Sequence, residues 1–150
     1  MDYYSSLKKQ LDYDLDCHFF DSIDSTNSFL ANSPYETKNQ LCVAREQTKG
    51  QGQHGRNWVS EKDGSIIFSI RQCFHEQVNV SGLSLVVGMA IIKSIEAECQ
   101  LLGLKIKWPN DIYIENQKLG GILLEMVGDP AGQCTVIIGV GINHAMPEQS

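Results

Sequence analysis

A long amphipathic segment at residues 81–102 gives the strongest structural signal in this sequence. Its apolar residues recur at steps of three and four, which places them on one face of a helix: Leu83, Val87, Ala90, Ile91, Ile95, Cys99 and Leu102. Gly103 follows as a suitable C-terminal stop. A helix with one apolar face has to pack against something, and the rest of the chain supplies a sheet.

The remaining segments have the patterns of strands joined by turns. A short helix is expected from Asp24 or Ser25, as N-cap, to about Ala31. Strands are expected at residues 17–23, 40–45, 65–71, 104–108, 111–115, 118–127 and 135–142. Short turns between strands predict a mixed, largely antiparallel sheet packed against helices, which is the α+β class. Because residues 1–150 contain neither linker nor repeat, we expect a single domain.

Charge and composition exclude several classes of function. The net charge of -6 argues against a non-specific nucleic-acid binder, which needs a basic surface. No apolar run approaches the roughly 18 residues of a membrane helix, and residues 1–15 lack the apolar centre of a signal peptide. We therefore expect a cytoplasmic protein that binds neither DNA nor a membrane. The five cysteines form no CxxC pair and the four histidines have no ligand spacing, so we expect reduced core thiols and no zinc site.

A glycine-rich segment, Gly50-Gln51-Gly52-Gln53-His54-Gly55, matches the GxGxxG pattern. No helical periodicity follows the third glycine, and no Gly-Lys-Ser/Thr follows either, so neither a dinucleotide-binding fold nor a P-loop is predicted. Glycines let backbone amides approach a ligand closely, and Lys49 and Arg56 add charge suited to a phosphate. Taken alone, the segment fits a flexible surface loop equally well.

The segment Lys107-Trp108-Pro109-Asn110-Asp111 places an amide beside a carboxylate, and a carboxylate beside a nucleotide often holds Mg²⁺. If Asn116-Gln117 is a two-residue turn, Lys118 pairs with Glu115 and shares a sheet face with Asp111. A lysine and a carboxylate on one face suit phosphate plus magnesium. Considered alone, this hairpin is better interpreted as a row of charged side chains exposed to solvent.

Glycines also interrupt the two strands that follow. Gly120-Gly121 and the pair Gly139 and Gly141 offer no side chain to pack, and such positions often mark the approach of a ligand to the backbone. Two neighbouring strands with few bulky residues therefore predict a flat surface, or floor, on which a flat ligand can lie.

Together these segments resemble the biotin protein ligases, in order and in spacing, over residues 22–146. Asp24-Ser25-Thr26-Asn27 resembles the family's DSTN, and residues 50–58 resemble its GRGRxGRxW loop. Residues 107–113 resemble KWPNDLY, 118–125 resemble KLAGILVE, and 139–143 resemble GxGIN. The resemblance implies the biotin/lipoate ligase type of catalytic domain. It also implies ATP-dependent activation of biotin to biotinyl-5′-AMP, followed by transfer to a lysine of a carboxylase biotin-carrier domain.

The resemblance also implies roles for individual residues. Lys118 and Arg56 would be catalytic. Biotin would be bound by Ser25, Thr26, Asn27, Gln47, Gly50, Gln51, Gly52, Gln53, Lys118 and Gly121. ATP would be bound by Arg56, Trp58, Asn110, Asp111, Lys118 and Asn143, with Asp111 as the Mg²⁺ ligand. The partners would be biotin, ATP and the biotin carboxyl-carrier protein of acetyl-CoA carboxylase or a similar enzyme, and the chain could form a homodimer.

The sequence departs from the family in its glycine-rich segment and in its extent. Gln51, Gln53 and His54 stand where the family usually has arginines, so a weaker grip on the adenylate phosphate is expected. The sequence has no room for the DNA-binding winged helix or for the small C-terminal barrel, which leads us to expect a truncated chain. The alternatives are a lipoate or octanoate ligase or transferase, and a non-catalytic module that binds biotin.

Overall fold

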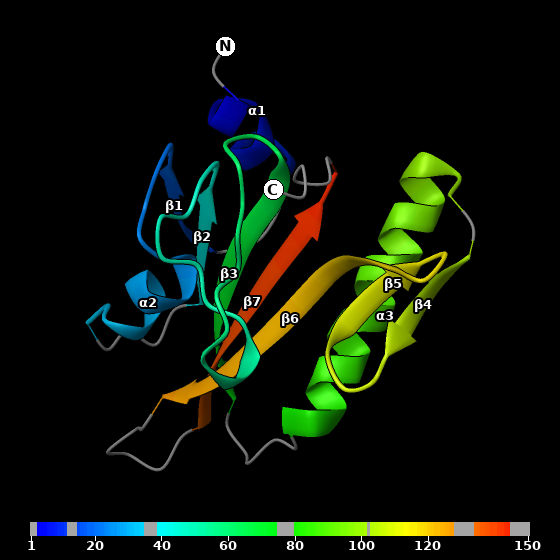
Figure 1. Ribbon diagram of the computed structural model, residues 1–150. Coiled ribbons are helices and arrows are strands. Elements are labelled where there is room, and N and C mark those ends of the chain that lie inside the picture. The colour runs from blue at the N-terminus through cyan, green and yellow to red at the C-terminus, as the bar shows by residue number, and fades with distance from the viewer. Residues whose placement is uncertain are drawn as a thin grey trace.

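The structure is a computed structural model that describes residues 3–11, 15–34, 39–74, 80–101, 103–127 and 134–144. A seven-stranded sheet forms its centre, in the order β1-β2-β3-β7-β6-β5-β4 (Figure 1). The strands are β1 (Asp16–Phe20), β2 (Gln40–Ala44), β3 (Ser65–Phe74), β4 (Leu104–Lys107), β5 (Asp111–Ile114), β6 (Gln117–Val127) and β7 (Cys134–Asn143). The pair β1–β2 is parallel and the other pairs are antiparallel, which confirms the predicted α+β class and mixed sheet.

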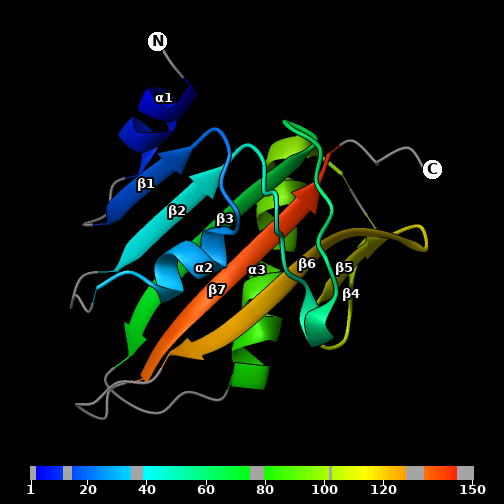
Figure 2. The same ribbon diagram turned by 60° about the vertical axis from the view of Figure 1, so that its left-hand side comes forward.

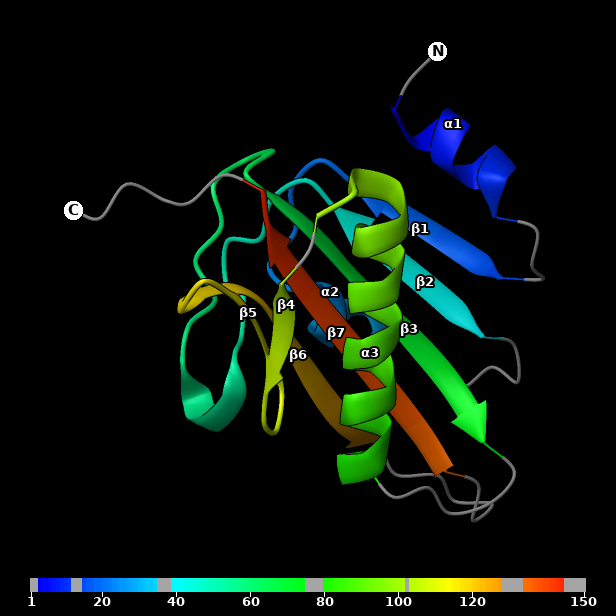
Figure 3. The ribbon, with the colours of Figure 1, turned by 90° about the vertical axis from the view of Figure 1, so that its right-hand side faces the viewer.

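The helices are α1 (Tyr3–Gln10), α2 (Thr26–Ala31), α3 (Val80–Cys99) and the short 3₁₀ turn η1 (Gln53–Gly55). Two of them, α2 and α3, lie on opposite faces of this sheet (Figure 2, Figure 3). Figure 2 shows α2 and the segment around η1 in front of β3, β7 and β6, with α3 behind the sheet. Figure 3 shows the reverse side, where α3 runs across the strands. One face is therefore closed by a long helix, and the other is covered only in part.

Strand β7 shows how alternation assigns its residues to these two faces. Val136, Ile138, Val140 and Ile142 are buried among the residues that pack against α3, whereas Ile137 packs with Leu30 of α2. Because alternate residues share a face, Gly139 and Gly141 lie on the α2 side with Ile137. The glycines thus face the open side of the sheet.

The predicted face of α3 is confirmed in its centre, where Leu83, Val87, Ile91 and Ile95 pack on the core. It is wrong for two positions, because Ala90 and Cys99 are exposed. Ala90 is next to Ile91 in sequence and so points about 100° away from it around the helix axis. Leu102 lies outside the described residues.

The helix also stops earlier than the glycine signal predicts. It ends at Cys99, and Gln100 already has a positive φ of 51°, whereas Gly103, at φ 89°, comes later. A left-handed residue directly after the last turn ends a helix, whichever residue type supplies it. At the N-terminal end of the chain, β1 stops at Phe20, and Ile23 forms only an isolated bridge with Gln47.

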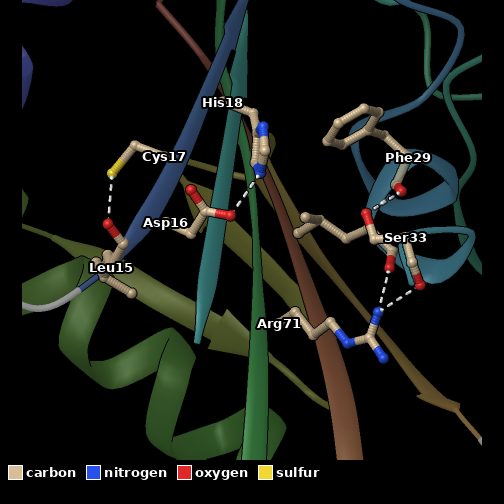
Figure 4. Close-up of polar contacts among 8 residues, drawn as sticks. Leu15, Asp16, Cys17, His18, Phe29, Ser33 and Arg71 are labelled. Carbon is tan, nitrogen blue, oxygen red and sulfur yellow. Dashed lines mark hydrogen bonds and ion pairs between the residues drawn. The ribbon is translucent and has the colours of Figure 1, made fainter. Parts of the chain in front are cut away.

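Helix α2 was predicted nearly to the residue, and it is fixed at both ends. The Ser28 backbone N–H donates to the Ser25 hydroxyl oxygen at 3.2 Å, which makes Ser25 the N-cap. At the other end, Nη1 of buried Arg71 donates to the carbonyls of Leu30, at 2.9 Å, and Ser33, at 3.1 Å (Figure 4). A cation at the carbonyl end of a helix is favourable, so β3 holds α2 in place.

Two features are absent from the described ranges. No helix in them is long and apolar enough to span a membrane. Nor do they contain a group of three or more His, Cys, Asp or Glu residues that could hold a metal ion. Cys42 and Cys134 are buried, as expected of core thiols, but Cys99 is exposed, so the expectation that all five lie in the core is wrong for this one.

Candidate ligand-binding site

A cavity of about 190 Å³ opens on the α2 face of the sheet. Its walls come from the start of α2, from the glycine loop (defined here as residues 47–58), and from the β5–β6 hairpin. Twelve residues predicted for biotin or ATP line it: Ser25, Thr26, Asn27, Gln47, Gln51, Gly52, Gln53, Arg56, Trp58, Asp111, Lys118 and Gly121. The fold thus brings together segments that are far apart in the sequence.

Three of the four glycines predicted to form a floor, Gly121, Gly139 and Gly141, line the cavity, whereas Gly120 shares the opposite face of β6 with Ile122. Gly121 of β6 pairs with Gly141 of β7, and Gly139 is the next residue on the same face of β7. A Cβ on Gly141 would lie 2.7 Å from the Trp58 ring, and a Cβ on Gly139 would lie 2.3 Å from Asn27 Oδ1. The glycines are therefore needed because two cavity side chains rest directly on the backbone.

The end of the cavity next to α2 is polar. Gln47 Oε1 accepts hydrogen bonds from the Thr26 backbone N–H, at 2.8 Å, and from the Thr26 hydroxyl, at 3.0 Å. The Thr26 hydroxyl also lies 2.7 Å from Ser69 Oγ, which donates to Asn27 Oδ1 at 2.5 Å. Asn27 Nδ2 donates to Glu125 Oε1 at 3.2 Å. This end suits a ligand group that forms several hydrogen bonds.

The opposite end carries a cation. Lys118 Nζ lies 3.1 Å from Asp111 Oδ1 and 5.6 Å from the centre of the Trp58 ring. Both side chains of the ion pair are partly exposed, so the pair contributes little to stability. A lysine held by one carboxylate and one aromatic face keeps its remaining N–H groups for an anionic ligand.

The turn that places Lys118 differs from the prediction. Glu115 and Asn116 have positive φ values of 48° and 67°, so they are the central residues, and Lys118 pairs with Tyr113 instead of Glu115. The pairing is shifted by two residues at Lys118, and a bulge between Ile112 and Tyr113 reduces the shift to one at Asp111, which pairs with Gly121. Because side chains alternate along β5, Tyr113 and its partner Lys118 still share a face with Asp111.

The glycine loop is more regular than its sequence indicates. Gln51 bridges to Asn57, and the Trp58 N–H donates to the Gly50 carbonyl at 2.9 Å, so the loop folds back on itself around η1. A Cβ on Gly50 would lie 2.6 Å from the Trp58 carbonyl oxygen. The loop holds the Trp58 indole over the floor, with its Nε1 atom buried and without a hydrogen-bond partner.

Three predicted residues do not line the cavity. Gly50 is buried, and its carbonyl accepts the hydrogen bond from the Trp58 N–H that folds the loop back on itself. Asn110 is buried and bonded internally, since it accepts from Ser84 Oγ at 3.0 Å and donates to the Ile122 carbonyl at 3.0 Å. Asn143 accepts from Ser65 Oγ at 2.7 Å. Their amide groups hold the sheet and its hairpin together, and their roles in ATP binding stay predictions.

Two residues that bear on the site were missed from the sequence. Ser69 is completely buried on the face that β3 turns toward the cavity, together with Ser65, Ile67 and Arg71. The buried face of a core strand is rarely mostly polar. This unusual alternation was the feature of the sequence that could have identified Ser69. Glu125 gave no such signal, because its partner Asn27 is 98 residues away in the sequence.

Fold and cavity together define a class: an α+β domain with a cavity that is polar at one end and carries a lysine at the other, which suits a small molecule with hydrogen-bonding groups at one end and an anionic group at the other. The profile of the Biotin/lipoate A/B protein ligase family matches residues 19–143. This chain belongs to that family.

Known proteins support this membership. The chain is 35% identical over 129 residues to the bifunctional ligase/repressor BirA of Escherichia coli K12, covering 83% of this chain and 39% of that protein. It is 33% identical over 124 residues to the biotin–[acetyl-CoA-carboxylase] ligase of Paracoccus denitrificans, covering 81% and 52%. The chain thus spans about half or less of the length of these relatives.

Solved structures show the same fold. The biotin protein ligase of Aquifex aeolicus in complex with biotin and ATP aligns with a TM-score of 0.74 and 31% identity, over 89% of this chain and 55% of that one. The enzyme of Leishmania major in complex with biotinyl-5-AMP aligns with a TM-score of 0.74 and 27% identity, over 90% and 60%.

Proposed function

We propose that this chain carries the site that activates biotin with ATP to biotinyl-5′-AMP and transfers biotin to a lysine of a carboxylase biotin-carrier domain. The observation that carries the proposal is that one cavity has Lys118 at one end and the hydrogen-bonding cluster of Thr26 and Gln47 at the other. Biotin has the complementary shape, since its ureido ring and its carboxylate lie at opposite ends of the molecule.

The chemistry needs positioning and charge, and it needs no protein nucleophile. A carboxylate oxygen of biotin attacks the α-phosphorus of ATP, and the bond to pyrophosphate breaks. The amine of the acceptor lysine then attacks the carbonyl carbon of the mixed anhydride, loses a proton and displaces AMP. Both steps place negative charge on oxygens next to the carboxylate position, where a fixed cation stabilises the transition state.

The chain's own residues divide this work. Lys118 neutralises the biotin carboxylate and then the phosphoryl oxygen. Arg56 and Trp58 line the same cavity and are assigned to the nucleotide side. The glycine loop closes over the adenylate and keeps water from hydrolysing it.

A magnesium ion fits this site only with help from the substrate. Asp111 supplies one carboxylate, and its Oδ1 atom already pairs with Lys118. Mg²⁺ commonly binds through one or two carboxylates plus substrate phosphates and water, so Asp111 Oδ2 together with ATP would suffice. When bound, the ion would offset the charge of the phosphates, and Asp111 would hold it beside Lys118.

The polar cluster favours biotin over lipoate. The dithiolane ring of lipoate has neither N–H nor carbonyl groups, so it could form no hydrogen bond with the polar side chains at this end of the cavity. Each hydrogen bond to a ligand contributes about 0.5–1.5 kcal/mol. We therefore expect calorimetry to show binding of biotin that is at least about tenfold tighter than binding of lipoate.

The test of the activity is biotin-dependent exchange of pyrophosphate into ATP. Lys118→Ala should lower the exchange rate by about 10²-fold or more, as expected for the loss of a main electrostatic contact. Lys105→Ala is the matched control, because this lysine is exposed on β4 and lies outside the cavity. Wild-type exchange in Lys118→Ala would contradict the role of Lys118. Binding of biotin without any exchange would identify a non-catalytic module.

Transfer is tested separately, by mass spectrometry of a biotin-carrier domain incubated with the chain, biotin and ATP. A mass increase of one biotinyl group on one lysine is expected. Assembly as a homodimer and a cytoplasmic location stay predictions from the sequence.

A further inference from the structure

An ion pair outside the cavity joins the two ends of the segment that contains the glycine loop. Arg45 directly follows β2, and Asp63 lies two residues before β3. Arg45 Nε donates to Asp63 Oδ1 at 2.7 Å, and Arg45 Nη2 donates to Asp63 Oδ2 at 2.6 Å. The Asp63 backbone N–H also donates to the Arg45 carbonyl, at 3.2 Å. Three hydrogen bonds thus hold together two residues that are 18 positions apart in the sequence, and we call this contact the base ion pair.

Two arms run side by side between this pair and the tip of the loop (Figure 2). The incoming arm, residues 46–49, is anchored to the chain just before α2, because three backbone hydrogen bonds of 2.8–3.1 Å join it to Ile23 and Asp24. The incoming arm is therefore part of the rigid wall of the site.

The outgoing arm, residues 59–62, has no such anchor. Within the described part of the chain, its hydrogen bonding reaches only the adjoining turn, where the Gly64 N–H donates to the Glu61 carbonyl at 2.9 Å. Its first residue, Val59, is 68% exposed. The outgoing arm is thus held at its two ends, by the Trp58 indole on the glycine floor and by Asp63 in the base ion pair.

We propose that Arg45 and Asp63 are positioning residues that fix the base of the glycine loop and thereby slow the release of the adenylate. Fixing Asp63 restricts where the outgoing arm can place Trp58, and so favours the closed loop. The inference rests on the proposed function, in which the loop closes over biotinyl-AMP.

The pair acts on the loop more than on the whole fold. The Arg45 and Asp63 side chains are 36% and 53% exposed, and exposed ion pairs add little to global stability. Their bidentate geometry nevertheless fixes the direction of Asp63 relative to the end of β2. To open, the outgoing arm has to swing away from the cavity about Asp63. The free energy of the ion pair therefore adds to the barrier between the closed and the open loop.

The rate of ligand release separates this role from a merely structural one. General loss of stability lowers the fraction of folded protein, but it does not change how fast a folded complex releases its ligand. The probe is an analogue of biotinyl-AMP in which a methylene replaces the carbonyl of the mixed anhydride, so that water cannot hydrolyse it. Its release is measured by chasing the loaded protein with excess biotin.

Asp63→Asn should release this analogue about three- to tenfold faster than the wild type, the range expected for the loss of one exposed bidentate pair. Asp63 has a positive φ of 62°, a conformation that asparagine also adopts, so the substitution removes the charge and keeps the backbone. Arg45→Lys should act in the same direction, because lysine keeps the charge but lacks the planar fork. The double variant should release the analogue no faster than the faster single variant, within about twofold, since both changes remove one contact.

Asp21→Asn is the matched control. Asp21 accepts a hydrogen bond from Arg45 Nη1 at 3.3 Å, but it lies directly after β1 and outside the segment between Arg45 and Asp63. Release from this variant should stay within about twofold of the wild-type rate. Wild-type release from both Asp63→Asn and Arg45→Lys would overturn the proposal. Equal acceleration in Asp21→Asn and Asp63→Asn would also overturn it, because the effect would then come from charge alone.

A second measurement needs no ligand and so separates this proposal from the proposed function. Trp58 Nε1 is buried, and its proton can exchange with water only when the loop lifts from the floor. NMR of the ¹⁵N-labelled free protein should show faster exchange of this indole proton in Asp63→Asn than in the wild type or Asp21→Asn. This pattern in a protein that binds neither biotin nor the analogue would contradict the proposed function and still support the base ion pair. Unchanged exchange in Asp63→Asn would overturn the role of the pair.

Discussion

The Gly139→Ala substitution gives the most direct test of how the cavity is built. An added Cβ would lie 2.3 Å from Asn27 Oδ1 and 2.9 Å from Asn27 Cγ. Asn27 cannot move aside freely, because it sits in the first turn of α2 and is bonded to both Ser69 and Glu125. Overpacking of this kind costs about 1–3 kcal/mol. A lost buried hydrogen bond adds about 1 kcal/mol, so the free energy of unfolding should fall by about 2–4 kcal/mol.

Urea unfolding followed by circular dichroism measures this loss, and titration calorimetry at a temperature where the variant is folded measures biotin binding. Biotin affinity should fall by about tenfold or more, because Asn27 and its neighbours lose their alignment. Gly82→Ala is the control: its Cβ would meet nothing within 4 Å, and it lies in the first turn of α3, so the substitution should not lower the free energy of unfolding. A Gly139→Ala variant with wild-type stability and wild-type biotin affinity would refute the close contact between Asn27 and the floor.

Three further predictions concern the loop, the pH dependence of stability and thiol reactivity. Gln53→Arg should slow the release of biotinyl-AMP and leave biotin affinity nearly unchanged, because it restores a charge-assisted hydrogen bond to the phosphate. Equal off-rates in the variant and the wild type would show that other residues bind the phosphate. The hydrogen bond from Arg45 lowers the pKa of Asp63 below its ordinary 3.8, so this pair stabilises the fold above that pH and stops doing so as the pH falls through the lowered value. The difference in unfolding free energy between wild type and Asp63→Asn should accordingly be present at neutral pH and shrink as the pH falls below 3.8, and a difference that stays constant during this acidification would count against it. Burial raises the pKa of the Cys42 thiol to about 12, so iodoacetamide at about pH 8 should alkylate exposed Cys99 first in the folded protein, as read by mass spectrometry; equal rates at the two cysteines would contradict this burial.

Local patterns in the sequence were sufficient for the elements and for much of the site. The steps of three and four in residues 81–102 predicted α3, and Ser25 predicted the start of α2, because both signals depend on neighbours within a few residues. The position of Lys118 on the same face as Asp111 also followed from alternation alone. It survived an error in the turn, since a shift of two residues preserves the face.

Contacts between distant strands were decided only by the tertiary structure. Nothing near Ser69 or Glu125 in the sequence indicates that they meet Asn27, because those contacts depend on the order β3-β7-β6 and on the register between these strands. The internal use of Asn110 has the same origin, as its partners are Ser84 on α3 and Ile122 on β6. Sequence periodicity reports which face a residue occupies, whereas the pairing of strands determines which residue lies opposite.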